Sequence, residues 1–274
     1  MVSTEQDPHE VMPRRASWRP ISIVSSIPHA LGTGWRYGSS ISRRSASLPL
    51  LLALLVAAVS TSGHAAHIKT LDGARFDLQT PGTFSHLKSG RLQIQTSMFL
   101  CQEPTVSCIN GVAIAYGTSL VRLFIQTNRL VVARGSSDVS SLVVFKATAN
   151  QNSYRLFLTP DRKSYVDVTM RTGQHGKHLE VNVAITPLIK KQGVDGLLGN
   201  GNGNPADDVT NAAEAGRRFK ISSTSNLLTC ASDSCQFVPL TAADKLASPP
   251  VKALQQGFTQ IDATKLPVST FNPN

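Results

Sequence analysis

The stretch Val166-Asp167-Val168-Thr169-Met170-Arg171 alternates apolar and polar residues with a period of two. Because successive side chains of a β-strand point to opposite faces, this pattern is typical of a strand with one dry face and one wet face. Residues 91–95 and 180–185 repeat the alternation. The more continuous apolar runs 120–125 and 130–133 favour strands that are buried on both faces or lie at the centre of a sheet.

Short turn signals separate these segments. They combine Gly, Pro, Asn and Asp, the residues that tight turns favour. They fall at Asp72-Gly73, Pro81-Gly82, Ser89-Gly90, Asn110-Gly111, Thr127-Asn128, Thr159-Pro160-Asp161 and Gly173-Gln174-His175-Gly176. Many short strands at this spacing predict an all-β fold, either an antiparallel sandwich or a barrel.

The composition sets the number and class of domains. The chain has 274 residues, of which 41% are hydrophobic and 16% charged, so it is able to bury a sizeable core and is not disordered throughout. Because single β-domains often exceed about 200 residues, we expect one domain with appendages. The four cysteines are too few to hold such a chain together, and apolar burial must do most of the folding.

The net charge of +10 raises the question of nucleic-acid binding. The first 66 residues carry six basic and three acidic side chains, so about +7 remains on the rest of the chain. The densest basic spots there are pairs such as Lys190-Lys191 and Arg217-Arg218, without the interleaved aromatics of a base-stacking surface. We therefore expect a solvated, mildly basic surface and no nucleic-acid partner.

Residues 43–66 have the three parts of a secretory signal peptide. Arg43-Arg44 precede an apolar run of about a dozen residues, 48–59, and small or polar residues follow as far as Ala65. A spanning helix needs about 20 apolar residues, so a permanent membrane anchor is the weaker alternative. Cleavage after Ala65 or Ala66 would give a secreted, extracellular protein that meets the membrane only transiently, through its signal segment.

Residues 1–42 are rich in Ser, Pro and Arg and show no periodicity, which predicts a disordered N-terminal extension. Signal peptides normally begin with only a few residues before the apolar run. A mis-assigned start codon, an unusually long leader and a transit-like extension all stay open as explanations.

The cysteines fall into two close pairs. An oxidising extracellular environment favours disulfides, and four cysteines allow three pairings. Cys101 and Cys108 bracket six residues and Cys230 and Cys235 bracket four, so we favour two local disulfides. A zinc site is the alternative, but neither pair has the CxxC spacing and no histidine flanks them.

A stretch rich in Gly, Asn and Asp follows the strand-patterned region. It reads Gly199-Asn200-Gly201-Asn202-Gly203-Asn204-Pro205-Ala206-Asp207-Asp208. Asn and Asp offer hard oxygen atoms, and Gly lets the backbone curl so that alternate side chains converge, as Ca²⁺ requires with its about six to eight oxygen ligands. The spacing departs from an EF-hand, from a repeated Ca²⁺ β-roll and from a phosphate loop. A Gly/Asn turn that holds no ion is the structural alternative.

Two motifs carry a family resemblance. Gly196-Leu197-Leu198-Gly199-Asn200-Gly201-Asn202-Gly203-Asn204-Pro205-Ala206-Asp207-Asp208 resembles the Gly-Leu-Cys-Gly-Asn-x-Asn-Gly-x-x-x-Asp-Asp signature of the von Willebrand factor type D domain. His67-Ile68-Lys69-Thr70-Leu71-Asp72-Gly73-Ala74-Arg75-Phe76-Asp77-Leu78-Gln79 resembles the opening His-x-x-Thr-Phe-Asp-Gly-x-x-Phe-x-Phe-x-Gly of that family. The resemblance covers residues 67–221, where 216–220 match the closing strand weakly, and leaves 222–274 as a C-terminal tail, either a tether or a partner strand.

The resemblance implies an antiparallel β-sandwich in which one Ca²⁺ pins the opening turn to the late loop. The matching ligands are Asp72, Asn200, Asn202, Asp207 and Asp208, together with a backbone carbonyl near Asn204. Leu198 and Asp195 stand where family members carry the cysteines of Cys-Gly-Leu-Cys, so the thiols of interchain assembly are absent. We interpret Asp195 as a turn residue and the chain as a single minimal D-type domain.

These features favour a non-catalytic adhesion or interaction module whose partner is an extracellular protein or a matrix or cell-wall component. The chain has no Gly-x-Ser-x-Gly elbow and no His-Glu-x-x-His motif. The lone histidines His67, His86, His175 and His178 are interpreted as surface or turn residues. Binding to a carbohydrate or lipid surface is the alternative function, and a hydrolase that uses Asp207 and Asp208 is a weaker one.

Overall fold

The computed structural model describes residues 66–101, 104–159, 161–231, 234–235, 237 and 252–271. The predicted extension, nearly all of the predicted signal peptide and the middle of the tail lie outside these residues. Among the helices of the described part, none is long and apolar enough to cross a membrane.

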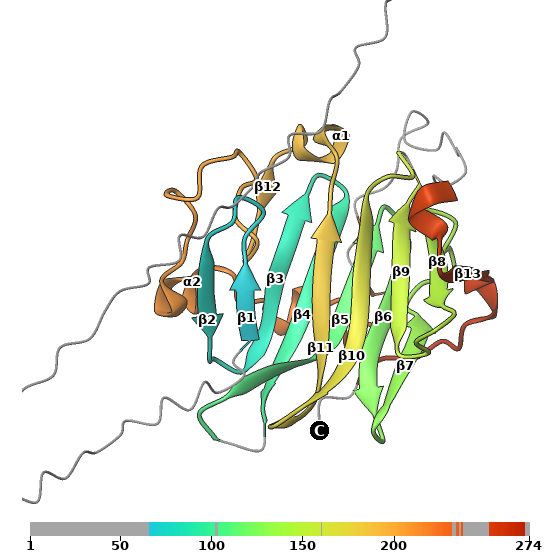
Figure 1. The fold of residues 1–274 in the computed structure, drawn as a ribbon, viewed down its shortest axis with the longest axis horizontal. Helices are drawn as coiled ribbons and strands as arrows, with labels where there is room; N and C mark the ends of the chain where they lie inside the picture. The colour runs from blue at the N-terminus through green and yellow to red at the C-terminus, as the bar shows by residue number, and fades with distance from the viewer. Residues whose placement is uncertain are drawn as a thin grey trace, which may run out of the picture. The chain divides into compact units, whose positions relative to one another are not determined.

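Two antiparallel sheets form a β-sandwich, with a separate hairpin of β1 and β2 beside them (Figure 1). The first sheet has the strand order β12-β3-β4-β5-β6-β7 and the second β11-β10-β9-β8-β13. The strands are β1 (Ala66–Lys69), β2 (Arg75–Leu78), β3 (Gly82–Ser89), β4 (Leu92–Leu100), β5 (Ser107–Tyr116), β6 (Ser119–Gln126), β7 (Arg129–Arg134), β8 (Leu142–Ala147), β9 (Ser153–Leu158), β10 (Tyr165–Gly173), β11 (Gly176–Ala184), β12 (Val194–Asp195) and β13 (Phe258–Ile261). The short helices are α1 (Pro187–Lys190) and α2 (Ala212–Arg218), with 3₁₀ turns at Ser223–Ser225, Lys252–Gln255 and Ala263–Lys265. The predicted all-β sandwich is confirmed.

The main core lies between the two sheets. In β10 the apolar side chains of Val166, Val168 and Met170 are buried, whereas the polar residues between them are partly exposed, as the alternation predicts. They meet buried residues of the facing sheet such as Val112 and Ile114 in β5. Burial of this apolar surface, worth roughly 25 cal/mol per Å², is the main force that closes the sandwich.

A second, smaller core covers the outer face of β5, β6 and β7. Leu120 and Phe124 of β6 pack there against Leu227, Leu228 and Phe271 of the C-terminal segment. The ring centroids of Phe124 and Phe271 lie 5.5 Å apart. The run 120–125, which is apolar apart from Arg122, is therefore buried on both faces over residues 120–124, as predicted, because the tail of the same chain supplies the second cover.

Arg122 is a buried cation at the centre of this second core. Its guanidinium donates hydrogen bonds to the carbonyl oxygens of Leu227, Ser269 and Cys230, at 2.7, 2.7 and 2.6 Å. Burial lowers the pKa of Arg122 to about 10, which leaves the side chain charged at neutral pH. One side chain of β6 thus holds two parts of the tail that are about 40 residues apart in sequence.

The tail also adds an edge strand. β13 pairs antiparallel with β8, so the partner-strand interpretation of the tail is correct for these residues. Arg155 of β9 holds the strand in place, because its guanidinium lies 4.1 Å from the ring centroid of Tyr165 and 4.6 Å from that of Phe258. The same guanidinium pairs with both carboxylate oxygens of Asp167 at 2.6 Å.

Most of the predicted turns that fall on described residues are observed. Thr127 and Asn128 have φ of 44° and 64° and close the β6–β7 hairpin, and Gln174 and His175 close the β10–β11 hairpin. The turn predicted at Asn110-Gly111 is wrong, because both residues lie inside β5, at a register shift against β4. Gly111 packs beneath the tail instead, where a Cβ would lie 3.3 Å from Leu228 and 3.4 Å from Phe271.

Both local disulfides are present. Cys101 pairs with Cys108, with Cα atoms 5.8 Å apart, and Cys230 pairs with Cys235, with Cα atoms 5.3 Å apart. The second disulfide sits beside Arg122, whose Nη2 lies 3.4 and 3.5 Å from the two sulfur atoms. It therefore fixes the chain where the tail meets β6.

We expect Arg122→Met to destabilise the protein by about 2–4 kcal/mol, because one buried and two partly buried carbonyl groups lose their donor while the side-chain volume is nearly kept. Urea unfolding followed by circular dichroism measures the loss. Arg129→Met at an exposed position of β7 is the matched control and should change the free energy of unfolding by less than about 0.5 kcal/mol. Equal effects of the two substitutions would contradict the role of Arg122.

Candidate metal-binding loop

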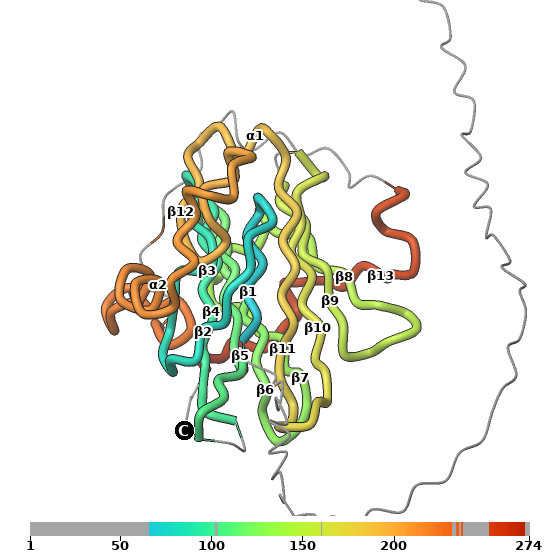
Figure 2. Tube along the Cα trace, turned by 60° about the vertical axis from the view of Figure 1, so that its left-hand side comes forward, coloured from blue at the N-terminus to red at the C-terminus, as the bar shows by residue number. Residues whose placement is uncertain are grey.

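The loop that follows β12 is joined by backbone hydrogen bonds to two other parts of the chain. The amides of Leu197 and Leu198 donate to the carbonyls of Ser85 and His86 in β3, both at 3.0 Å. The amide of Leu71, in the turn between β1 and β2, donates to the carbonyl of Leu198 at 2.8 Å. Figure 2 shows the β1–β2 hairpin and β12 side by side. The two sequence motifs, about 130 residues apart, therefore meet in the structure.

Alternate glycines determine the path of the loop. Gly199, Gly201 and Gly203 have φ of 78°, 67° and 92°, a left-handed conformation that favours glycine. Between them, the side-chain oxygens of Asn200, Asn202 and Asn204 accept hydrogen bonds from backbone amides two residues further on, at 3.0, 2.7 and 3.2 Å. The Gly-Asn repeat thus forms a series of three Asx turns, in which Gly adopts positive φ and the Asn side chain accepts a hydrogen bond from the backbone.

Three carboxylates meet this loop. Asp72 accepts hydrogen bonds from the amides of Asn202 and Gly203 at 3.1 and 2.8 Å. Asp207 accepts from the side-chain amides of Asn200 and Asn202 at 3.1 and 2.7 Å. Asp208 accepts from the amide of Asn200 at 3.2 Å. The structure thus joins Asp72, Asn200, Asn202, Asp207 and Asp208 in one network, whereas the side chain of Asn204 bonds to Ala206.

The chemistry of these side chains fits a cation that prefers oxygen ligands. The Oδ2 atom of Asp208 is buried and has no hydrogen-bond partner among the described residues, a condition that costs on the order of 1–3 kcal/mol unless a cation or a donor compensates it. Within the described residues, no group of three or more His, Cys, Asp or Glu side chains is placed so that it could hold a metal ion. A cation here would therefore depend on asparagine and backbone oxygens as much as on carboxylates.

The positions that correspond to the family's cysteines have other contacts. Leu198 is buried in the main core, and Asp195 is exposed with its carboxylate 3.2 Å from Nη2 of Arg218. Asp195 is not a turn residue as interpreted, because it lies in β12 and pairs with Lys88 of β3.

The closing strand expected at 216–220 is also largely wrong. Asn211 accepts a hydrogen bond from the amide of Glu214 and caps α2, which ends at Arg218. Only the residues after the helix approach β3, where Lys220 forms a bridge with Phe84. The helix forms because Asn211 and Glu214 make a good N-terminal cap and Arg217 and Arg218 suit its C-terminus.

His86 is one of the buried polar side chains that sequence reasoning missed. His86, interpreted as a surface or turn residue, lies in β3 with 2% of its surface exposed. Burial lowers its pKa to about 4, so the imidazole is neutral at neutral pH. The alternation in residues 84–89 would have placed one of His86 and Leu87 outside, and nothing local in the sequence signals that both are buried.

Comparison with protein families matches residues 60–214 to the von Willebrand factor type D domain. This range covers more than half of the chain, so the protein belongs to the von Willebrand factor type D domain family. The family is one of extracellular, non-enzymatic modules that act by binding other proteins. Comparison with curated proteins found no match. The boundaries 67 and 221 stay predictions.

Gly199→Ala should be much more harmful than Gly203→Ala. Both residues have positive φ, so each substitution costs about 1–2 kcal/mol of backbone strain. A Cβ at Gly199 would also lie 2.1 Å from Oδ1 of Asp208, whereas nothing lies within 4 Å of one at Gly203. We expect Gly199→Ala to lose at least about 1 kcal/mol more in urea unfolding. Similar losses would show that the Asp208 carboxylate is not fixed where the structure has it.

Proposed function

We propose that this protein is a secreted, Ca²⁺-stabilised interaction module that binds an extracellular protein or a matrix or cell-wall component without catalysis. Membership of the family supports the class of function. Two observations support Ca²⁺ binding. Asp72 and Asp208, from opposite ends of the domain sequence, contact the same loop. The Oδ2 atom of Asp208 has no hydrogen-bond partner among the described residues. Bound Ca²⁺ would supply the positive charge that the loop lacks and would be held by Asp72, Asn200, Asn202, Asp207, Asp208 and a backbone carbonyl near Asn204.

Hydrogen bonds of Asp72 and Asp207 hold the loop in its conformation. Asp72 ties the β1–β2 turn to the loop through two backbone amides, and Asp207 orients the two asparagine side chains. Such a link is useful to a module that must keep a fixed binding surface outside the cell, where Ca²⁺ is abundant. A dissociation constant on the order of 10⁻⁴ to 10⁻³ M suffices there.

Chelation should lower the melting temperature. At a free Ca²⁺ concentration about tenfold above the dissociation constant, the ion contributes about 1.4 kcal/mol, which corresponds to roughly 3–6 °C for a domain of this size. Asp72→Asn should remove most of this difference because it removes one charge from the site. Circular dichroism is the suitable probe, since both tryptophans, Trp18 and Trp35, precede the predicted cleavage site.

The matched control is Asp195→Asn, which removes an exposed carboxylate close to the loop but outside the proposed ligand set. This variant should keep the full response to chelation. The same three proteins are then compared for retention on extracellular matrix or cell-wall material, where the native chain and Asp195→Asn should bind alike. A melting temperature that chelator leaves unchanged would contradict Ca²⁺ binding, and absence of retention would contradict the interaction module.

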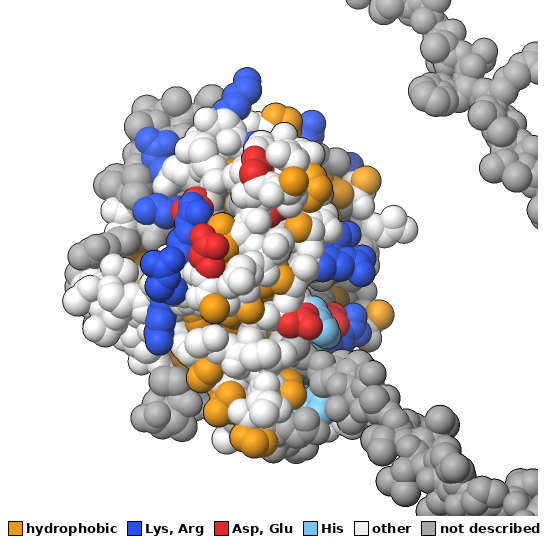
Figure 3. Space-filling model, turned by 90° about the vertical axis from the view of Figure 1, so that its left-hand side faces the viewer, with side chains coloured by type: hydrophobic (Ala, Val, Ile, Leu, Met, Phe, Trp, Pro, Cys, Tyr) orange, Lys and Arg blue, Asp and Glu red, His pale blue; other side chains and the backbone are white. Residues whose placement is uncertain are grey.

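The surface suits an aqueous, extracellular setting. Lys and Arg side chains gather along the margins of the face shown in Figure 3, with a few acidic side chains among them. Basic pairs such as Lys190-Lys191 and Arg217-Arg218 have no interleaved aromatic residues in the sequence. They favour partners of opposite charge, such as acidic proteins or glycans, over nucleic acids whose bases are recognised by stacking.

The start of β1 bears on where the signal peptide is cleaved. Ala66 is buried, belongs to the main core and pairs with Leu78 of β2. Cleavage after Ala65 keeps this residue, whereas cleavage after Ala66 removes it. We therefore expect N-terminal sequencing of the secreted chain to begin at Ala66, and a start within the leader or inside β1 would contradict the proposed processing.

A further inference from the structure

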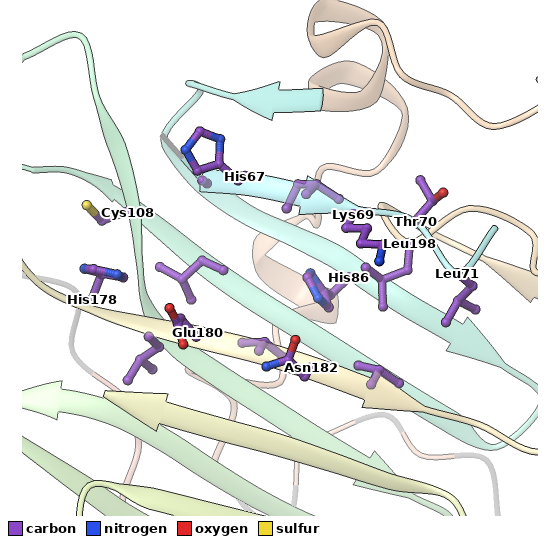
Figure 4. A pocket seen from close by; sticks show the side chains of 16 residues that line it. His67, Lys69, Thr70, Leu71, His86, Cys108, His178, Glu180, Asn182 and Leu198 are labelled. Atoms are coloured by element: carbon purple, nitrogen blue, oxygen red, sulfur yellow. The ribbon is translucent and has the colours of Figure 1, made fainter. Parts of the chain in front are cut away.

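A cavity of about 610 Å³, here called the β1–β11 gap, separates β1 from β11 (Figure 4). Six consecutive residues line it on each side, 66–71 in β1 and its turn and 178–183 in β11. Because successive side chains of a strand point to opposite faces, a cavity above one face of a strand is lined by alternate residues. A wall of consecutive residues therefore indicates that the cavity faces the edges of both strands.

Both strands are open on this side. Among the described strands, β11 pairs only with β10 and β1 only with β2. Figure 4 shows that β1 and β11 run in the same direction, since His67 and His178 lie toward one end of the gap and Thr70 and Asn182 toward the other. The β1–β11 gap thus lies between two open strand edges that run side by side.

The main-chain groups of β1 that face the gap belong to its exposed residues. The amide of Thr70 donates to the carbonyl of Ala74 across the hairpin turn at 2.9 Å. Since the N–H and C=O groups of successive residues alternate between the two edges of a strand, Ile68 bonds to β2 in the same way. His67 and Lys69 therefore turn their N–H and C=O groups away from β2, toward the gap.

One hydrogen bond shows that this edge accepts a main-chain partner. The amide of Leu71 has the same phase as the amide of Lys69, and it donates to the carbonyl of Leu198 at 2.8 Å. Leu198 lines the gap, so the pairing of β1 on this side begins at the end of the gap.

The main-chain groups of β11 that face the gap belong to its inward residues. The amide of Met170 donates to the carbonyl of Asn152 at 2.8 Å, on the β9 side of β10. The residues before and after Met170 therefore bond to β11, where they pair with Glu180 and His178. The residues of β11 that turn their N–H and C=O groups to the gap are Leu179, Val181 and Val183.

The two open edges are complementary to one extended chain. On β1 the open groups come from residues of the outer face, and on β11 they come from residues of the inner face. A strand between them offers the groups of every second residue to β1 and those of the residues in between to β11. If the open groups of both parallel strands came from the same face, no single strand would be able to pair with both.

The side chains around the gap define what such a chain carries. Its inward side chains meet Ile68 and Leu179, which are buried and apolar. On the outer face, Glu180 already pairs with Arg171 at 2.8 Å, whereas Lys69 is exposed and forms no ion pair among the described residues. An acidic side chain on the outer face of the added strand complements the charge of Lys69.

We propose that the β1–β11 gap is a strand-addition site for a partner protein. The bound segment is extended and about five residues long, to match residues 179–183 of β11. It alternates apolar side chains toward the core with polar ones toward solvent, and it places an acidic residue beside Lys69. Main-chain hydrogen bonds give affinity and the alternate side chains give specificity. This proposal rests on the proposed function as an interaction module and names its binding site and the class of its partner.

The probe is the peptide acetyl-Gly-Ser-Thr-Val-Asp-Val-Thr-Ser-Gly-amide, titrated into the secreted chain in excess Ca²⁺ and followed by NMR. We expect saturable binding in the millimolar range or tighter. The amides of Lys69, Val181 and Val183 should shift most and become protected from hydrogen exchange. Those of Ile68 and Glu180, which already bond within their sheets, should change little.

Methylation of single main-chain nitrogens of the peptide distinguishes a gap between two edges from one open edge. In the gap, the amides of the aspartate and of the following valine bond to different strands. Methylation of either nitrogen should therefore weaken binding at least about tenfold, because a main-chain hydrogen bond is lost. At a single open edge only one of the two methylations would have this effect.

Two pairs of variants test the main chain and the charge. Val181→Pro removes an N–H that faces the gap but no bond to β10, and should abolish peptide binding, whereas Val181→Thr keeps the main chain and should bind as the native chain does. Lys69→Glu should weaken binding about threefold, and a peptide with lysine in place of aspartate should reverse this preference. Lys88→Glu, on β3 and outside the gap, is the control for net charge and should leave binding unchanged. Melting curves confirm that each variant is folded.

Several outcomes would overturn the proposal. They are a lack of saturable binding, binding that Val181→Pro leaves unchanged, and an effect of methylation at only one of the two nitrogens. Amides of Lys69 and Val181 that are protected in the free chain would show that another segment of this chain or a second copy fills the gap, which also contradicts a partner protein. If Val181→Pro does not fold, the two methylated peptides still decide the result with the native chain.

Retention on matrix or cell-wall material separates this proposal from the proposed function. Loss of retention in Val181→Pro but not in Val181→Thr would support both. Equal retention of the two variants would keep the interaction module but contradict the β1–β11 gap as its binding site. Peptide binding by a chain that matrix and cell-wall material do not retain would support the strand-addition site and contradict the proposed function.

Discussion

The arrangement of the whole site depends on three backbone hydrogen bonds at one junction. The amides of Leu197 and Leu198 bond to the carbonyls of β3, and the amide of Leu71 bonds to the carbonyl of Leu198. Gly196 makes this close approach possible, because a Cβ there would lie 2.9 Å from the carbonyl oxygen of His86. The junction places Asp72 against the asparagine loop, and it meets β3 at the register shift that contains His86.

A second constraint is the packing of the C-terminal segment against the outer face of β5, β6 and β7. The family match ends at residue 214, yet Leu227, Leu228 and Phe271 complete the outer core and Phe258–Ile261 form an edge strand. Among the residues that the structure describes, no carboxylate pairs with the buried Arg122, and three carbonyl groups replace the water it loses. A charged side chain in such a place ties the tail in one register, because a shifted tail would leave the guanidinium unsatisfied. The described residues of the C-terminal segment therefore pack against both sheets.

The sequence predicted those features that depend on local chemistry. Strand alternation follows from the geometry of a single strand, and the Gly-Asn turns follow from which residues adopt positive φ. The sequence did not predict the features that depend on contacts between residues far apart in the chain. Asn110-Gly111 has the sequence of a turn. In the structure, however, Gly111 lies inside β5, where Leu228 and Phe271 of the tail pack against it. The bulge at His86 and the partner of β8 likewise depend on segments far away in the sequence, and the alternation pattern carries no information about them.

Leu198 and Asp195, which stand at the positions of the two cysteines in the family's Cys-Gly-Leu-Cys motif, make different contacts. Where relatives carry the second cysteine of Cys-Gly-Leu-Cys, Leu198 contributes an apolar wall to the cavity, and its carbonyl still anchors the β1–β2 turn. At the position of the first cysteine, Asp195 faces solvent and pairs with Arg218 of α2. The pair of thiols is thus replaced by one apolar contact inside and one polar contact outside. The three backbone hydrogen bonds of the junction need neither cysteine side chain, because they join main-chain amides and carbonyls only.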